Sequence, residues 1–435
     1  MSATAQAPSQ QGQPPQQAQG QLVPQPPNGV AQQAPQKEPA SSAQRVMRIS
    51  IVTVVVSVLV AALGFVLAQQ QSSGLDRAAT RADRVLTVMA VRTALLEADG
   101  AATNAFLVGG LEPQARRVVY DVAIEEAATG LAALASGAHE DADLIASLNA
   151  DLTRYTSLVE AARVNNRQGF PVGAAYLDQA STLVREQMLT DLDAVLMVAA
   201  DDAAADFAVG NWSVVVLVVV IGALLVLVIC QVRLATMTRR WLNPGLALAT
   251  VLMFVALVVG GLGATSSAGT AAAVRSDSYR PTLAVAQASV LAAEARTLES
   301  FTLIKRGSGA EFESQFVDRT DRAAELLEAQ DQNLADLLQT WLERHAEIRE
   351  LDDGGNWDDA VTLAVSDEDG GPSQAYAQLA EAASARVDEG AEQVRSELGE
   401  ASGGARTAAW VLLITGILAA AASWRGLSAR REEYR

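Results

Sequence analysis

Four long runs of apolar residues, none with a charged residue in its interior, constrain this chain more than any other feature. The runs span residues 49–68, 213–230, 246–264 and 408–424. Each is about long enough to cross the roughly 30 Å hydrocarbon core of a bilayer as an α-helix. We therefore expect an all-α membrane protein with four transmembrane helices.

The apolar runs divide the rest of the chain into three short segments and two long ones. The short segments are 1–48, 231–245 and 425–435, and the long ones are 69–212 and 265–407. Together the short segments carry a formal charge of +7, whereas the long segments carry −10 and −15. Because Lys and Arg in short flanking segments stay on the cytoplasmic side, we expect both termini in the cytoplasm and both long segments outside. The predicted location is the inner (plasma) membrane, with several spans.

The N-terminal region has two interpretations. Val66 and Ala68, before Gln69, resemble a signal-peptidase site. The first apolar run is longer than a usual signal core, however, and the whole of segment 1–48 precedes it, so both features favour an uncleaved anchor. The segment 1–40 contains eight Pro and twelve Gln. Such a segment buries too little apolar surface to offset its ordering entropy, so we expect a disordered tail, with docking of a cytoplasmic partner as the alternative.

The first long segment has the periodicity of helices that pack against a partner. From Leu75 to Leu107, small and aliphatic residues recur every three or four positions for about nine turns. Breaks at 109–110, 136–137 and 169–171 divide the segment into four helices. No proline lies between 68 and 111 or between 172 and 212, so the outer helices can continue from the spans as rods of roughly 60 Å. These features predict a membrane-anchored four-helix bundle.

The second long segment repeats this plan. Phe106 and Phe301 lie at nearly the same sequence distance beyond the first and the third apolar run. Further pairs at matching spacing are Tyr155 with Trp341, Gly169 with Gly355, and Ala174 with Ala360. The middle helices of the second copy look shorter, and an acidic loop at Ser366–Pro372 interrupts its last helix. We therefore predict two tandem four-helix bundles outside the cell, related by internal duplication.

No motif in the chain indicates catalysis. The predicted cytoplasmic segments, 1–48, 231–245 and 425–435, are too short for a kinase or cyclase domain. His139 and His345 each lack a second ligand at metal spacing and are interpreted as surface residues. The acidic clusters lack the alternating ligands of a calcium loop. Spans without charged residues also argue against an ion-coupled transporter. We expect no enzyme, no cofactor, no metal and no nucleic-acid binding.

The densest basic surface of the predicted exterior lies at the start of the first bundle. Three arginines of this surface, and one from the matching part of the second bundle, are the candidate ligand- or partner-binding residues: Arg77, Arg81, Arg92 and Arg296. An arginine binds a carboxylate through two parallel hydrogen bonds. The alternative is that these side chains, with Arg84, keep the surface soluble and form ion pairs between helices with the nearby Asp76, Asp83 and Asp99.

The connector between the second and third spans is the candidate docking surface for a cytoplasmic partner. Its candidate residues are Arg233, Arg239, Arg240 and Trp241. The alternative is that these residues serve only to set the membrane topology.

The order of features resembles known sensor proteins. An apolar run, a helix ending in Asn104-Ala105-Phe106-Leu107, and then Tyr155, Gly169 and Ala174 resemble the four-helix-bundle sensor domains of chemoreceptors and sensor kinases. The architecture and length across residues 49–424 are similar to the GlnX family, the membrane component of an actinobacterial amino-acid sensing system. This resemblance implies two partners, a periplasmic amino-acid-binding lipoprotein and the soluble Ser/Thr protein kinase G, and it transfers no binding residues.

A transmembrane signal relay is the function that these observations predict. The exterior bundles would receive an amino-acid-loaded binding protein or a small ligand, and rigid helices would pass the signal inward. The two bundles would pack side by side as a covalent pseudo-dimer, and a homo-oligomer is also compatible with the sequence. Two alternatives remain, a non-signalling membrane scaffold for envelope proteins and an accessory subunit of a transporter.

Overall fold

The computed structural model describes most of the chain, and its regular structure is helical. The described residues are 42–108, 114–136, 141–207, 212–238, 243–305, 309–366 and 368–433. These ranges contain no strand. They include four helices that are long and apolar enough to cross a membrane. The all-α prediction is confirmed and the four apolar helices fit a membrane protein, whereas the predicted disorder of residues 1–40 lies outside the described residues.

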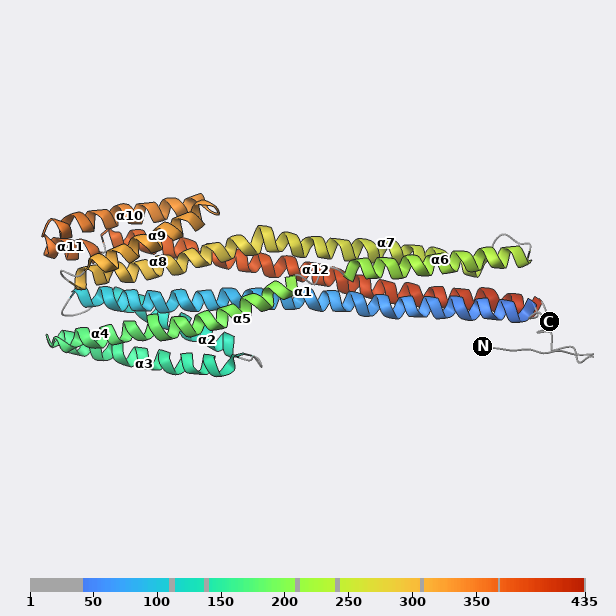
Figure 1. Ribbon diagram of the computed structural model, residues 1–435, viewed down its shortest axis with the longest axis horizontal. Helices are drawn as coiled ribbons and strands as arrows, with labels where there is room; N and C mark the ends of the chain where they lie inside the picture. Colours follow the sequence, from blue (N-terminus) through green and yellow to red (C-terminus); the bar gives the residue numbers. More distant parts are fainter. Residues whose placement is uncertain are drawn as a thin grey trace, which may run out of the picture.

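Three helical rods run along the length of the molecule. Helix α1 (Ser42–Val108) continues for 67 residues without a break, and α12 (Pro372–Glu433) for 62. The third rod joins α7 (Pro244–Ala273), the π-helical turn η2 (Val274–Tyr279) and α8 (Arg280–Ile304). Figure 1 shows α1 and α12 side by side along the length of the molecule.

The π turn in the third rod lies next to a proline. Pro281 lies at the start of α8 and has no backbone N–H, so it cannot complete the regular α-helical hydrogen-bond ladder. The wider turn of η2 covers the six residues directly before Arg280, in the stretch of helix to which the missing hydrogen bond would belong. The rod therefore passes the proline without a break.

Shorter helices lie at one end of the molecule, on opposite sides of the long helices (Figure 1). One side holds α2 (Gln114–Ala135), α3 (Ala142–Arg167), α4 (Val172–Thr182), η1 (Leu183–Met188) and α5 (Leu189–Phe207). The other holds α9 (Ala310–Glu328), α10 (Gln332–Asp353) and α11 (Trp357–Ala364). We call this the polar end. Its first half is α2–α5 with the adjoining part of α1, and its second half is α9–α11 with α8 and the adjoining part of α12.

The helix ends agree with the predicted breaks. Helices α1, α2 and α3 end at Val108, Ala135 and Arg167, each just before a predicted break. Gly169 and Gly355 have positive φ angles of 72° and 82°, a conformation that side-chain-bearing residues rarely adopt. The shorter middle helices of the second half are also confirmed, with 19 and 22 residues in α9 and α10 against 22 and 26 in α2 and α3.

The hydrophobic core of the first half extends into the second half. Buried aliphatic residues of α1–α5 form a continuous cluster that also includes Ala286, Val290 and Ala293 of α8. A second cluster lies between α8, α9, α10 and α12, around the fully buried Trp341. The halves therefore pack directly against each other across α1, α8 and α12, the side-by-side arrangement predicted for the two long segments.

The opposite end of the rod, called the apolar end, contains α6 (Trp212–Thr238) and α7. Helix α7 starts close to the end of α12, where the Asn243 side chain accepts a hydrogen bond from Gly245 N at 3.1 Å and donates one to Gly426 O at 3.2 Å. A β-carbon added at Gly245 would lie 2.5 Å from Gly426 Cα, so only glycine allows this approach. Residues 208–211, where the fourth predicted helix would enter the second span, lie outside the described residues. The predicted domain boundaries stay predictions.

Candidate functional site

Three of the four predicted exterior arginines form ion pairs between α1 and α5. Arg77 Nε lies 3.7 Å from Asp206 Oδ1, and Arg81 Nη1 lies 3.2 Å from Asp206 Oδ2. Arg92 pairs with Asp193, which lies several turns before Asp206 on α5. These side chains are thus engaged by acids of their own chain, which is the ion-pair alternative stated from the sequence.

The acids in those pairs are not the predicted ones. Asp76 and Asp83 instead accept hydrogen bonds from α12, from Arg406 at 3.0 Å and Arg395 at 2.8 Å. Asp99 is buried and accepts a hydrogen bond from Ser181 Oγ at 2.6 Å. Neighbours in a helical sequence point about 100° apart, so Asp76 and Asp83 face α12 while the arginines beside them face other partners, and Asp99 faces the interior. The predicted pairing of these aspartates with the arginines of α1 was wrong for this reason.

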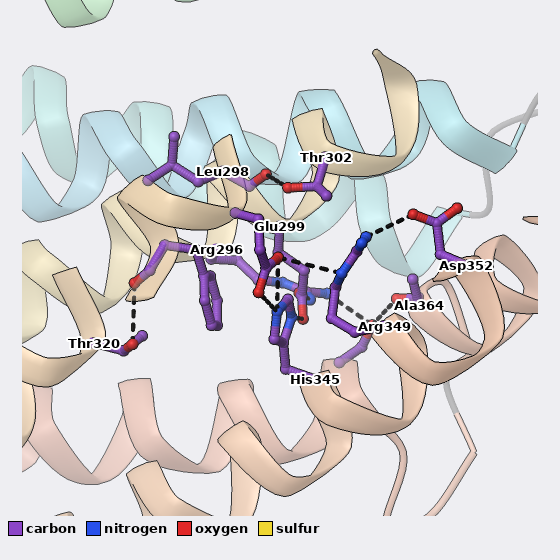
Figure 2. A network of polar contacts seen from close by, with 12 residues as sticks. Arg296, Leu298, Glu299, Thr302, Thr320, His345, Arg349, Asp352 and Ala364 are labelled. Carbon is purple, nitrogen blue, oxygen red and sulfur yellow. Dashed lines mark hydrogen bonds and ion pairs between the residues drawn. The ribbon is translucent and has the colours of Figure 1, made fainter. Parts of the chain in front are cut away.

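The fourth predicted arginine, Arg296, lies at the centre of a buried polar network (Figure 2). Its side chain is on α8 and is only 8% exposed. Arg296 Nη1 donates to Glu299 Oε2, and Nη2 donates to Ser373 Oγ on α12 at 2.9 Å. Its guanidinium also lies over the Tyr376 ring, 5.6 Å from the centroid. Arg296 therefore connects the interior of the second half to α12.

His345 on α10 belongs to the same network and corrects the surface interpretation of this residue. It is 5% exposed and stacks on Phe316 with ring centroids 3.8 Å apart. His345 Nδ1 lies 2.9 Å from Glu299 Oε1, and Nε2 lies 3.2 Å from both carboxylate oxygens of Glu313. Helix α10 begins after Asp331, whose side chain accepts hydrogen bonds from two backbone N–H groups of its first turn.

The sequence does contain a signal for this burial. The buried residues of α10 follow one another at intervals of four and three: Leu334, Leu338, Trp341, His345 and Ile348. Such spacing marks the core-facing side of a helix, and the histidine occupies one of its positions. The neighbouring positions are charged, so the composition of the helix is polar although one of its faces is buried.

The carboxylates around His345 keep its ring protonated. Burial alone lowers the pKa of His345, but the hydrogen bonds and charges of Glu299 and Glu313 outweigh it and raise the pKa to about 9. Burial likewise raises the pKa of Glu299, and here Arg296 and His345 together outweigh burial and lower it. At neutral pH the network is a set of alternating charges in which both ring nitrogens of His345 donate.

The network continues to the surface through Arg349. Its Nε lies 3.5 Å from Glu313 Oε2, and its Nη1 donates to Asp352 Oδ2 at 2.6 Å (Figure 2). Among the described residues, no group of three His, Cys, Asp or Glu side chains is arranged to hold a metal ion. The arrangement suits a structural or positioning role, because each buried charge already has an opposite charge beside it.

A cavity of about 370 Å³ lies between the two halves, next to this network. Residues from α1, α2, α8 and α12 line it, and its polar side chains include Glu97, Asn104, Arg116, Arg296, Ser373 and Tyr376. A neighbouring cavity of about 290 Å³ shares Glu97 and Tyr376. Its other charged lining residues are all acids: Glu126, Glu381 and Asp388. We call the two cavities together the inter-half cleft.

Glu97 is the most unusual residue of this cleft. Its carboxylate forms no hydrogen bond or ion pair with any described residue. Burial, and then the charge of Glu126, raise the pKa of Glu97 to about 7. Such an acid is partly desolvated, and no described cation forms an ion pair with it, so a cation bound in the cleft would stabilise its charged form.

The amide nitrogen of Asn104 is a second polar group without a partner among the described residues. The residue is 6% exposed, and its Nδ2 makes no hydrogen bond in the described part of the protein. Its Oδ1 accepts from Arg116 Nη1 at 2.8 Å, and Arg116 also donates to Val365 O in the second half. A buried amide donor without an acceptor costs free energy, which makes this position unusual in a packed interior.

The structure thus brings one predicted residue into a site and leaves the others apart. Arg296 lines the inter-half cleft, whereas Arg77, Arg81 and Arg92 lie along the α1–α5 surface. Sequence reasoning did not identify the other polar residues of the cleft as a site: Glu97, Asn104, Arg116 and Tyr376. Glu97 and Asn104 are two turns apart on α1, within the stretch in which small and aliphatic residues recur. Two polar residues in such a stretch are the sequence signal that indicates a site.

On the predicted cytoplasmic side, one candidate can be placed. Arg233 lies on α6 with its side chain exposed. Arg239, Arg240 and Trp241 lie outside the described residues. The docking surface therefore stays a prediction.

Comparison with known protein families adds one finding. Residues 74–208 match the family described as an actinobacterial sensor domain. The matched range begins in α1 and ends just beyond α5, so it covers the first half and contributes Glu97, Asn104 and Arg116 to the cleft. This supports an actinobacterial sensor protein with a sensing or signalling role. No curated protein and no solved structure matches the chain.

Proposed function

We propose that this protein is a transmembrane signal relay. The main support for this proposal is the continuity of α1. Part of α1 lies in the matched sensor domain, and the helix continues unbroken from the inter-half cleft to the apolar end. The rod of α7, η2 and α8 and the rod of α12 make the same connection from the second half. A displacement of one half against the other would therefore move helices that enter the membrane.

The contacts between the halves suit such a movement. Apart from the shared core, several links are exposed ion pairs: Asp76 with Arg406, Asp83 with Arg395 and Asp178 with Lys305. Exposed pairs contribute only about 0–1 kcal/mol each. The glycine contact between α7 and α12 would couple the two rods at the apolar end, where α7 begins and α12 finishes.

In this proposal the protein spans the inner membrane. The polar end lies outside the cell, and both termini lie in the cytoplasm. The charge distribution of the segments supports this orientation. We also propose that the halves are duplicated four-helix bundles. Support comes from Tyr155 and Trp341, which are both fully buried at matching positions, and from the positive φ of both Gly169 and Gly355.

The orientation is tested by cysteine labelling of the full chain in intact cells. Ser157→Cys on α3 and Gln339→Cys on α10 place a thiol on an exposed position of each half, in a background with Cys230→Ala. Both sites should react with a maleimide that does not cross the membrane. Protection of either site until the cells are opened would overturn the proposed orientation.

By resemblance to the GlnX family, the proposed input is an amino-acid-loaded binding lipoprotein and the proposed output is a soluble Ser/Thr kinase. The kinase would bind the surface around Arg233, Arg239, Arg240 and Trp241. Pull-down of the kinase by the full protein should be lost when residues 231–245 are scrambled without altering insertion. Unchanged pull-down would remove this site assignment.

The relay itself is tested by measuring the distance between the halves. Spin labels on Ser157→Cys and Gln339→Cys in the full protein, reconstituted in nanodiscs, report that distance by pulsed electron resonance. Loaded lipoprotein should shift the distribution and unloaded lipoprotein should not, because a signal requires different affinities for two states. An unchanged distribution favours the alternative of a non-signalling scaffold. Co-purification with a nucleotide-binding subunit would instead favour the transporter-accessory alternative.

A further inference from the structure

We infer that the inter-half cleft binds a small zwitterionic molecule directly, with its ammonium group at Glu97 and its carboxylate at Arg296 and Asn104. This inference deepens the relay proposal and rests on it for its consequence. The binding site itself is argued from the side chains that line the cleft.

The acidic side of the cleft determines the first group of the ligand. Glu97 has no partner among the described residues, and the cavity beyond it is lined by Glu126, Glu381 and Asp388. No Lys or Arg is among the residues that line this second cavity. A protonated amino group would give the Glu97 carboxylate the charged hydrogen bond that it lacks.

The other side of the cleft determines the second group. Arg296 is buried, and its contacts with Glu299 and Ser373 use one N–H of each Nη atom, which leaves part of its planar fork of five donors. Asn104 Nδ2 lies in the same cavity lining and has no acceptor. A charged guanidinium and an amide N–H that line the same cavity are suited to binding a carboxylate.

The two groups lie close enough for one small ligand. Gly100 lies one turn after Glu97, and a β-carbon added there would be 3.7 Å from Arg296 Cγ. Tyr376 lines the same cavity as Glu97 and Arg296, and its ring centroid lies 5.6 Å from the Arg296 guanidinium. Small-molecule sites commonly measure roughly 300–1,000 Å³, and a cavity of about 370 Å³ is at the lower end of this range.

The position of the site explains how a ligand would act. Glu97 and Asn104 belong to α1 in the first half, Arg296 to α8 and Tyr376 to α12 in the second. One molecule that contacts all of them would hold the halves in a single arrangement. A ligand that binds this arrangement more tightly than others would shift the population toward it.

The test uses the full protein in nanodiscs and isothermal titration calorimetry at pH 8. The probes are L-glutamine, L-glutamate and glycine as zwitterions, with cadaverine as an amine alone and glutarate as an acid alone. At least one zwitterion should bind, and both single-function probes should bind at least about tenfold more weakly, since each lacks one charged hydrogen bond. Binding of none of the zwitterions would overturn the inference, as would equal binding of cadaverine.

Two variants test the assigned contacts. Glu97→Gln should weaken zwitterion binding at least about tenfold, whereas Glu125→Gln, which removes the same charge from an exposed position of α2 outside the cleft, should leave it unchanged. Asn104→Asp keeps the oxygen that accepts from Arg116 and exchanges only the unpartnered donor for a second negative oxygen, so it should also weaken binding. Unchanged affinity in both variants, with circular dichroism equal to the parent, would place the ligand elsewhere.

The same sample separates this inference from the relay proposal. If no zwitterion binds but the loaded lipoprotein still changes the distance between Ser157→Cys and Gln339→Cys, the ligand site is wrong and the relay stands. If a zwitterion binds and neither it nor the lipoprotein changes that distance, the site stands and the relay is wrong.

Discussion

Glu299 on α8 is a buried carboxylate and Glu97 on α1 is a partly buried one; both lie on helices that join the halves, yet their surroundings are opposite. Glu299 accepts hydrogen bonds from Arg296 and His345, and its pKa is lowered. Glu97 has no partner among the described residues, and its pKa is raised to about 7. A carboxylate with two cations beside it holds a structure together. One without a partner costs stability, and such a group is typical of a binding site.

The largest expected effect is on the paired carboxylate. Glu299→Gln removes the negative charge between Arg296 and His345 and leaves two buried cations without it. The free energy of unfolding should fall by about 3–5 kcal/mol. Equilibrium unfolding of the full protein in micelles, followed by the fluorescence of its tryptophans, measures this change. Glu311→Gln, at an exposed position of α9, should change stability by less than about 0.5 kcal/mol. Equal effects of the two variants would show that Glu299 is not a structural partner.

The histidine of the same network should make stability depend on pH. The pKa of His345 is about 9 in the folded protein, against an ordinary value of 6.5 for a histidine exposed to water. The stabilisation from its proton is therefore fully present below pH 6.5 and is lost as the pH rises through 9, with a maximum on the order of 3 kcal/mol. The difference in stability between the parent and His345→Gln should shrink between pH 7 and pH 10. Parallel stability curves would contradict the buried ion pairs.

The unpartnered carboxylate should show the opposite sign. A raised pKa in the folded state means that ionisation of Glu97 destabilises the protein, increasingly as the pH rises from 4.5 to 7. The charged or titratable groups that line the two cavities with it are Arg116 and Glu126 on α2, Arg296 on α8, and Tyr376, Glu381 and Asp388 on α12. Without ligand, Glu97→Gln should therefore stabilise the protein by about 1–3 kcal/mol at pH 8 and have almost no effect at pH 4, below the pKa of the unfolded state. A loss of stability at pH 8 would mean that Glu97 has a partner after all.

The smallest effect is expected for an acid at the surface. Asp83→Asn removes an ion pair with Arg395 in which both side chains are about half exposed. Its cost should be below about 1 kcal/mol and should shrink further in 0.5 M salt. The same unfolding measurement applies. A cost as large as that of Glu299→Gln would show that exposure does not separate the two kinds of carboxylate.

Much of the scaffold could be predicted from local sequence. The absence of proline between residues 68 and 111 accounts for the length of α1 in this region, and glycines mark the ends of α3 and α10. These are short-range effects, because backbone freedom and helix propensity act within a few residues. Arg296 was also recognised as a candidate, although from its place in the repeat and not from its partners.

The partners of the charged side chains could not be predicted in the same way. His345 looked like a surface residue because Glu299 and Glu313, which surround it, lie 46 and 32 residues away on other helices. The aspartates beside the arginines of α1 face α12 or the interior, because successive helical residues point in different directions. Sequence distance does not reveal which helix a given face meets.

The amino-acid sequence by itself determined the four apolar helices, the places where the helices at the polar end stop, and the acidic character of the two long segments. These depend on hydrophobicity, on glycine and proline, and on net charge, which are properties of each segment alone. Only the tertiary structure decided that Glu299 accepts hydrogen bonds from two cations and that Glu97 forms no ion pair with a described residue. The physical reason is that the ionisation energy of a buried group depends on charges and solvent brought to it by other helices.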